Sequence, residues 1–183
     1  MSAASPAAPS TPAVHKGFLL ALLAASQFVV VLDASITNVA LPSIGRDLGL
    51  SQDSLSWVVN AYTLTFGGFL LLGGRLADIL GRRRVYMWGL ALFAIASFVG
   101  GFSQSETTLI IARAVQGLGA ALLSPAALSI LTSTFREGAE RNRALGVWGA
   151  VAGAGGAAGV LLGGVLTEYL SWRWVFFVNV PIG

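Results

Sequence analysis

Long apolar segments alternate with short polar connections along almost the whole chain. A helix needs about 20 mostly apolar residues to cross a bilayer, and each complete segment is near that length. The pattern predicts five spanning helices, at about residues 17–41, 55–74, 85–103, 108–132 and 144–166. A sixth apolar segment, 172–183, would reach only about 18 Å as a helix. It therefore predicts part of a sixth span.

The predicted fold is an all-α, polytopic membrane helix bundle, and the composition agrees with it. Hydrophobic residues make up 55% of the chain and charged residues only 10%, against about 25% charged residues in soluble domains. The sequence has no cysteine, and its only histidine, His15, lies in the polar N-terminal segment. This excludes a disulfide framework, a thiolate metal site and a histidine relay. With no nucleophile and no acid–base pair in evidence, we expect neither an enzyme nor a metal site.

The N-terminal segment, residues 1–16, is rich in Ala, Ser and Pro and has no hydrophobic pattern. This composition predicts a disordered tail. The apolar run after it resembles a signal peptide at first sight, but it is too long and contains Asp33 and Asn38. An uncleaved first membrane helix is the better interpretation.

Lys and Arg residues gather on one side of the predicted membrane. Eight lie in the tail and in the second and fourth connections: Lys16, Arg75, Arg82, Arg83, Arg84, Arg136, Arg141 and Arg143. Only Arg46 and Arg173 lie on the other side. By the positive-inside rule, the N-terminus is predicted to be cytoplasmic. The net charge of +3 is explained by this topology and does not indicate nucleic acid.

Asp33 interrupts an otherwise apolar run from Phe18 to Leu41. An ionisable side chain at such depth normally faces a cavity or a partner charge, and it indicates an ion or proton path. Ser26, Val30 and Thr37 share its face of the helix, which predicts that this stripe points into the bundle. Because burial penalises a charged carboxyl, we expect Asp33 to bind a proton near neutral pH. For Ser26 and Thr37, a hydrogen bond in helix packing is the alternative.

Arg113 is the second charge inside a predicted span, with Gln116 and Gly117 one turn along. A guanidinium stays protonated, so Arg113 can hold a carboxylate but cannot carry the proton itself. The alternative is that its side chain extends to the outer interface, because it lies only about five residues inside its span.

Glycines recur every four residues in segment 144–166, at Gly149 and Gly153 and again at Gly155, Gly159 and Gly163. Small residues at this spacing let helix backbones approach closely in lipid. We expect a close helix–helix contact here.

Four segments together resemble the major facilitator superfamily, in its fourteen-span drug:proton antiporter branch. They are LDASITNVALP (32–42), GRLADILGRRR (74–84), RAVQGLGAA (113–121) and GGAAGVLLGG (155–164). WRWVFFVNVPIG is also similar to the family's entry into helix six. Ser35, Thr37 and Val160 depart from the family pattern, Val160 standing where proline is usual. The resemblance implies the N-terminal half of a major facilitator fold.

The resemblance also implies roles for particular residues. Asp33 and Arg113 would couple transport to protons. A substrate cavity would be lined, on weaker grounds, by Ser26, Thr37, Asn38, Asn60 and Gln116. The second motif would form a cytoplasmic conformational latch of Gly74, Asp78, Gly81, Arg82 and Arg83. Simple anchoring at the membrane is an equal alternative for the arginines. The fifth helix would act as a gate through Gly155, Gly159, Gly163 and Gly164.

The function expected from these implications is proton-coupled export of a small, drug-like molecule by alternating access. The protein would work in the inner cell membrane with a proton gradient and no cofactor. Its partners would be protons, a small-molecule substrate, the bilayer and a C-terminal half beyond Gly183. The alternative is a truncated half-transporter that transports nothing and serves as an interaction module or is inactive. The nucleotide sequence after Gly183 distinguishes the two.

Overall fold

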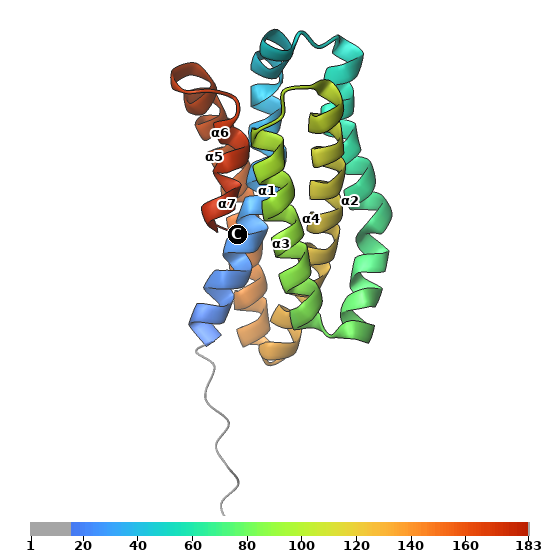
Figure 1. Ribbon diagram of the computed structural model, residues 1–183. Helices are drawn as coiled ribbons and strands as arrows, with labels where there is room; N and C mark the ends of the chain where they lie inside the picture. The colour runs from blue at the N-terminus through green and yellow to red at the C-terminus, as the bar shows by residue number, and fades with distance from the viewer. Residues whose placement is uncertain (1–15, 183) are drawn as a thin grey trace, which may run out of the picture.

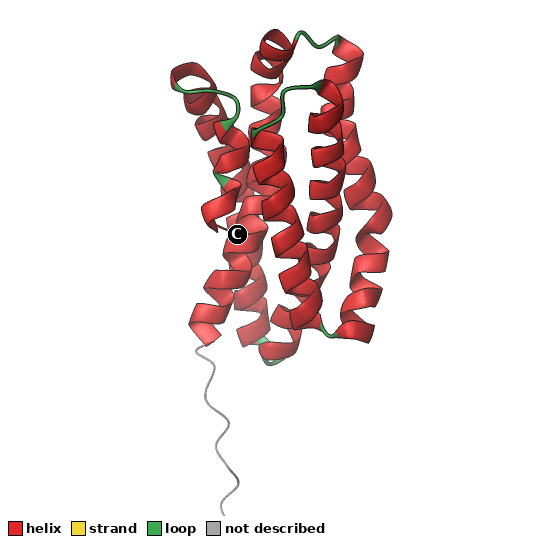
Figure 2. Cartoon of the chain, viewed as in Figure 1, coloured by secondary structure: helices red, strands yellow, loops and turns green. Residues whose placement is uncertain are grey.

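A computed structural model describes residues 16–182 of the chain, and this part is entirely helix and short turns (Figures 1 and 2). Five long helices run roughly alongside one another, and two short helices follow them. The seven helices are α1 (Lys16–Leu48), α2 (Gln52–Leu80), α3 (Arg82–Gly101), α4 (Glu106–Thr134), α5 (Ala139–Tyr169), α6 (Trp174–Phe177) and α7 (Asn179–Ile182). The five long ones are long and apolar enough to span a membrane, as the sequence predicts.

Polar residues and glycines set the helix ends. The Ser51 hydroxyl accepts a hydrogen bond from the Ser54 amide and caps α2, and Ser105 caps α4 in the same way through Thr108. Each such cap satisfies an amide that the first turn of a helix leaves free. Gly81 joins α2 to α3 with φ of 96°, a conformation that side chains other than glycine rarely adopt.

The helices extend further than the apolar segments that predict them. α1 continues through Pro42 to Leu48, and α5 begins at Ala139 rather than near residue 144. The charged segment 74–84, expected to be a connection, is helical except at Gly81. The predicted bounds are short because hydropathy marks only the part of a helix that lies in hydrocarbon. The expected disordered tail lies outside the described residues, apart from Lys16, which begins α1.

The last apolar segment forms two single turns interrupted at Val178. Proline has no amide hydrogen, so Pro181 cannot donate the hydrogen bond that would continue the helix from Phe177. α6 and α7 pack against α1 and α3. The interruption places Asn179 at the start of α7, facing the bundle interior.

Three helix pairings organise the bundle into two groups. α1 packs along α5, whereas α2 and α3 both pack along α4, and α1 and α4 meet in the middle. Close approach of α3 and α4 depends on Gly89 and Gly119. A Cβ at either would lie 2.6 Å from a backbone nitrogen of the other helix.

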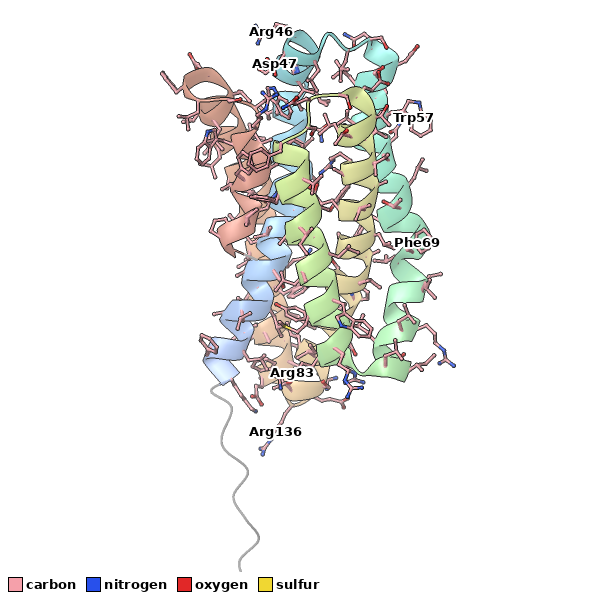
Figure 3. The ribbon with its side chains drawn as sticks, viewed as in Figure 1. Arg46, Asp47, Trp57, Phe69, Arg83 and Arg136 are labelled. Atoms are coloured by element: carbon pink, nitrogen blue, oxygen red, sulfur yellow. The ribbon has the colours of Figure 1, made fainter. Side chains whose placement is uncertain are left out.

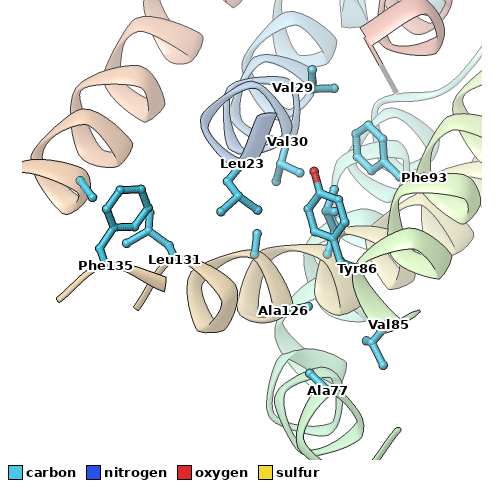
Figure 4. Close-up of a cluster of buried hydrophobic side chains, with 14 of the residues drawn as sticks. Leu23, Val29, Val30, Ala77, Val85, Tyr86, Phe93, Ala126, Leu131 and Phe135 are labelled. Carbon is cyan, nitrogen blue, oxygen red and sulfur yellow. The ribbon is translucent and has the colours of Figure 1, made fainter. Parts of the chain in front are cut away.

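Two apolar clusters fill the interior on either side of the middle of α1. The first joins α1, α3 and α4 and includes Leu23, Val30, Tyr86, Phe93 and Leu131 (Figure 4). The second includes Ile36 of α1, Leu109 of α4 and Phe176 of α6. Asp33 lies between Val30 and Ile36 on α1, so the buried polar groups described next are enclosed by apolar side chains on both sides.

The charged side chains labelled in Figure 3 lie at the two ends of the bundle. Arg83 and Arg136 lie at one end and Arg46 and Asp47 at the other (Figure 3). This is the segregation that the sequence predicts for the three arginines.

Candidate functional site: a buried ion pair between α1 and α4

Asp33 is completely buried, and its carboxylate is surrounded by hydrogen-bond donors. Nη1 of Arg113 donates to Oδ2 at 2.6 Å. Nε2 of Gln116 and Nδ2 of Asn179 each donate to Oδ1 at 2.7 Å. Hydrogen bonds to a carboxylate stabilise its charged form. The acid that stands alone in the sequence therefore has hydrogen-bond donors from α4 and α7 on both of its oxygens.

Arg113 is 1% exposed and points into the bundle. Nη1 also donates to Oε1 of Gln116 at 2.9 Å, and Nε donates to the Val58 carbonyl at 3.2 Å. The guanidinium lies over the Tyr62 ring, 4.3 Å from its centroid. The alternative interpretation, in which Arg113 extends to the outer interface, is wrong because these partners hold it inside.

The pair is enclosed as well as neutralised. Two charges leave water at a cost of several kcal/mol each, which their attraction repays only if the remaining polar groups are also satisfied. Gln116 meets this need on both sides, since its amide donates to Asp33 and its carbonyl oxygen accepts from Arg113. The three side chains form a closed triangle between α1 and α4.

Asn179 and Ser97 complete the site, and neither was predicted from the sequence. Nδ2 of Asn179 donates to Oγ of Ser97 at 3.0 Å, and the Ser97 hydroxyl donates to the Phe176 carbonyl at 2.8 Å. Both side chains are completely buried. Asn179 could have been found from the sequence, because it is a lone amide in the apolar segment 172–183. Ser97 has no comparable signal, because single serines are common in membrane helices.

The predicted polar stripe of α1 faces the interior, as expected. Ser26 and Val30 are each 5% exposed and Thr37 is 1% exposed. The Ser26 hydroxyl donates to the Leu23 carbonyl of its own helix at 2.7 Å, so this bond does not join two helices. The Thr37 hydroxyl is buried, and within the described part of the chain it has no hydrogen-bond partner.

The other two candidate cavity residues lie apart from Asp33. Asn38 is exposed on α1 and donates to the Ala34 carbonyl at 2.7 Å. Asn60 is exposed on α2 and lines an open hollow of about 410 Å³ with Leu41 and Pro42 of α1. Of the five candidate cavity residues, only Gln116 hydrogen-bonds to Asp33.

The candidate latch residues lie at the α2–α3 turn, at the end of the bundle that carries Arg83 (Figure 3). Gly74 is partly buried near Pro125, and Gly81 forms the turn. Arg82 reaches the Ser129 carbonyl of α4 at 3.4 Å. Asp78 is exposed and takes part in no ion pair among residues 16–182.

Three of the four candidate gate glycines make the predicted close contact, and α1 is their partner. A Cβ would lie 2.8 Å from the Phe28 carbonyl oxygen at Gly155, and 2.6 Å from Ser35 Cβ at Gly159. At Gly163 it would lie 2.8 Å from Val39 Cβ. Gly164 faces open space. Gly149 and Gly153 were also expected to pack, but a Cβ at either would have nothing within 4 Å.

Comparison with known proteins agrees with this architecture. A bacterial homologue of the human lysosomal transporter Spinster, solved in an inward-facing, unoccupied conformation, superposes with a TM-score of 0.80 at 18% identity. The match covers 94% of this chain and 42% of that one. A peptide transporter, POT, superposes with a TM-score of 0.77 at 18% identity, over 91% of this chain and 35% of that one. At this identity the likeness concerns the fold alone.

Other relatives share more of their sequence with this chain than these two structures do. The puromycin resistance protein pur8 of Streptomyces alboniger is 53% identical over 163 residues, which are 89% of this chain and 32% of that protein. The cephamycin export protein CmcT of Amycolatopsis lactamdurans is 57% identical over 164 residues, which are 90% of this chain and 34% of that protein. The chain thus spans about a third of the length of these relatives.

A sequence model of the Major Facilitator Superfamily matches residues 23–183, which include most of α1, the other four long helices and the whole buried network. This family consists of membrane transporters, in agreement with the expectation that the chain is not an enzyme. The chain is a multi-pass membrane protein that belongs to the Major Facilitator Superfamily.

Proposed function

We propose that this chain is the N-terminal bundle of a proton-coupled exporter of small, drug-like molecules. The observation that carries the proposal is the buried pair of Asp33 and Arg113, 2.6 Å apart and enclosed between two apolar clusters. An acid and a base are costly at this depth. A role in proton movement explains why both are present in otherwise apolar helices.

The proton acts on the contact between α1 and α4. When Asp33 is charged, its carboxylate holds Arg113, which donates to it at 2.6 Å. A proton on Asp33 cancels that charge and weakens the attraction, whereas Arg113 stays charged. Arg113 keeps the Val58 carbonyl and the Tyr62 ring as partners. The two protonation states therefore favour different packing of α1 against α4, which is the differential interaction that a conformational switch requires.

Coupling to the substrate is indirect in this scheme. Asp33 is 0% exposed, so it does not meet a substrate in this conformation. The exposed amides of Asn38 and Asn60 are better placed for that contact. Of the other candidate cavity residues, Ser26 and Thr37 are buried and Gln116 belongs to the ion-pair network.

The gate and the latch act at two other contacts. The glycines at 155, 159 and 163 give α5 a smooth face on α1, along which the two helices slide. The exposed Asp78 and Arg83 at the α2–α3 turn pair with the opposing half of the transporter, which supplies the other wall of the cavity. Anchoring of the arginines at the cytoplasmic surface is compatible with this role.

The proposed location is the inner cell membrane, with the N-terminus in the cytoplasm. The segregation of Arg83 and Arg136 from Arg46 supports this orientation. The energy source is a proton gradient, with no cofactor. The names of the relatives suggest puromycin as the first export probe and a cephamycin as the second.

Export in inverted membrane vesicles tests the proposal. The transporter that contains this chain is expressed, a proton gradient is imposed, and uptake of puromycin into the vesicles is followed. We expect Asp33→Asn to abolish gradient-driven uptake, whereas Asp47→Asn, at an exposed carboxylate, keeps it. Unchanged uptake with Asp33→Asn would refute the proposal. If the coding frame stops after Gly183 and the purified chain transports nothing, the half-transporter alternative holds.

A further inference from the structure

In the described part of the chain, only the nitrogen of the Asn179 side-chain amide makes hydrogen bonds. Nδ2 donates to both Asp33 and Ser97, at 2.7 and 3.0 Å. Oδ1 is buried and has no hydrogen-bond partner within residues 16–182. A buried acceptor without a partner costs about 1–3 kcal/mol. An unused acceptor beside an acid therefore requires an explanation.

We propose that Asn179 is a positioning residue that senses the protonation state of Asp33 and transmits it to the backbone of α6. The side-chain amide rotates end for end when Asp33 binds a proton, and Ser97 passes the change to the Phe176 carbonyl. This inference rests on the proposed function, because it requires that Asp33 binds and releases a proton.

The hydrogen bonds of the charged state form an unbroken series. A carboxylate only accepts hydrogen bonds, so Asp33 holds the donor end of Asn179. Ser97 accepts from the same nitrogen, which leaves its own hydrogen free for the Phe176 carbonyl. The charge on Asp33 thus fixes the orientation of Asn179 and, through Ser97, ties α6 to α3.

Protonation turns Asp33 from a group that only accepts hydrogen bonds into one that also donates. A carboxylic acid carries a hydrogen that needs an acceptor, and the NH2 group of Asn179 offers none. Gln116 is prevented from rotating because its own oxygen accepts from Arg113 at 2.9 Å. The Asn179 oxygen makes no hydrogen bond that rotation would break, since it has no partner in the described chain.

Rotation about the last torsion of Asn179 exchanges Nδ2 and Oδ1 with little change of shape, and this torsion is soft. Oδ1 then accepts the hydrogen of the Asp33 acid. It also accepts the hydrogen of Ser97, whose hydroxyl turns away from the Phe176 carbonyl. In this exchange Nδ2 gives up its hydrogen bonds to Asp33 and Ser97. Only Asp33 gains a proton, and all other changes are in hydrogen bonds.

The Phe176 carbonyl, which loses its hydrogen bond from Ser97 in this step, belongs to the short helix α6. α6 is a single turn of four residues and the helix is interrupted just beyond it. The Phe176 ring packs on α3, where a Cβ at Gly100 would lie 3.2 Å from it. The protonation state of Asp33 is thereby communicated to the α3–α6 contact as well as to α4.

Few charged groups surround Asp33 in the described part of the chain. Arg113 on α4 is the charged group that faces it, and the Tyr62 phenol on α2 lies beyond Arg113. α3, α6 and α7 contribute neutral side chains or carbonyls, and α5 has no titratable residue between 144 and 166.

Nuclear magnetic resonance of the chain in lipid nanodiscs tests the inference. The pH is varied while three labelled positions are followed: Asp33 Cγ, Asn179 Nδ2 and the Phe176 carbonyl carbon. We expect all three signals to change with one shared midpoint. The exposed amide of Asn38 serves as an internal control and should not change.

Two variants separate the steps of the relay. With Ser97→Ala, Asp33 and Asn179 should still change together while the Phe176 carbonyl loses its pH dependence. With Asn179→Leu, Asp33 should still titrate and the carbonyl should again be constant. Helix content measured by circular dichroism verifies that each variant is folded.

The outcomes distinguish the inference from the function on which it rests. If Asp33 titrates but Asn179 Nδ2 does not follow it, the relay is wrong and the proposed function stands. If Asp33 Cγ shows no titration in the wild-type chain, the proposed function fails and the relay fails with it. A Phe176 response that survives Ser97→Ala would overturn the role of Ser97.

Discussion

Asp33 and Arg113 are 80 residues apart in the sequence, and their side chains meet at 2.6 Å with exposures of 0% and 1%. The pair connects the two helix groups of the bundle, since α1 packs with α5 and α4 packs with α2 and α3. The ion pair makes the α1–α4 contact depend on charge. The α1–α5 and α3–α4 contacts, where glycines allow close approach, depend on shape.

The first prediction concerns the coupling within this pair. Asp33→Asn or Arg113→Gln alone leaves a buried charge without its partner, which should cost about 3–5 kcal/mol of unfolding free energy. The double variant leaves no unpaired charge, so its loss should be well below the sum of the two. Denaturation of the purified chain in mixed detergent micelles measures all three. Additive losses would show that the two residues act independently.

The second prediction concerns the glycine face of α5. A methyl group at Gly159 would lie 2.6 Å from Ser35 Cβ and 2.9 Å from the Leu32 carbonyl oxygen. Gly159→Ala should therefore destabilise the bundle by about 1–3 kcal/mol, as overpacking does. Gly164→Ala is the matched control, because nothing lies within 4 Å of its methyl position. Equal effects of the two in thermal unfolding would contradict the proposed contact with α1.

The third prediction concerns the contact of Trp172 and Arg173, just before α6, with the end of α1. Nε1 of Trp172 donates to Asp47 at 2.8 Å, and Arg173 donates to the same oxygen at 2.9 Å. Trp172→Phe keeps an aromatic ring and removes one hydrogen bond, so it should cost about 0.5–1.5 kcal/mol. Trp57→Phe, at a residue 52% exposed, should change stability by less than about 0.5 kcal/mol. Chemical denaturation compares the two variants. An equal loss would remove any special role for the Asp47 contact.

The fourth prediction concerns orientation, and the absence of cysteine makes it simple to test. A single cysteine is introduced either at Gln104, in the exposed α3–α4 turn, or at Glu137, in the exposed α4–α5 turn. In right-side-out vesicles, a membrane-impermeant maleimide should label the first variant and spare the second. The reverse pattern would place the N-terminus outside the cytoplasm.

The sequence predicts the elements of this fold better than it predicts their contacts. Hydropathy identifies all five long helices, and helical periodicity orients Asp33 inward. Both signals are local, because they depend on residues within a few turns of one helix. The predicted spans do not give the helix ends where α1 and α5 continue into polar sequence, because hydropathy has no signal there.

The partners of Asp33 depend on the assembled bundle. Arg113 and Gln116 were candidates because of their depth and the family pattern, but nothing in the sequence places their side chains on Asp33. Asn179 is 146 residues from Asp33, and it reaches the site because α6 and α7 pack against α1 and α3. The satisfied carboxylate, in place of a lone acid, is therefore a result of tertiary structure.

The proposed mechanism requires that Asp33 binds and releases a proton, and infrared spectroscopy of the chain in lipid detects this event itself. A buried carboxylic acid has a carbonyl stretching band that the carboxylate lacks. As the pH is lowered, we expect this band to appear in the wild-type chain and to be missing from Asp33→Asn. If the band never appears in the wild-type spectrum while the helices stay folded, Asp33 takes up no proton and the mechanism is wrong.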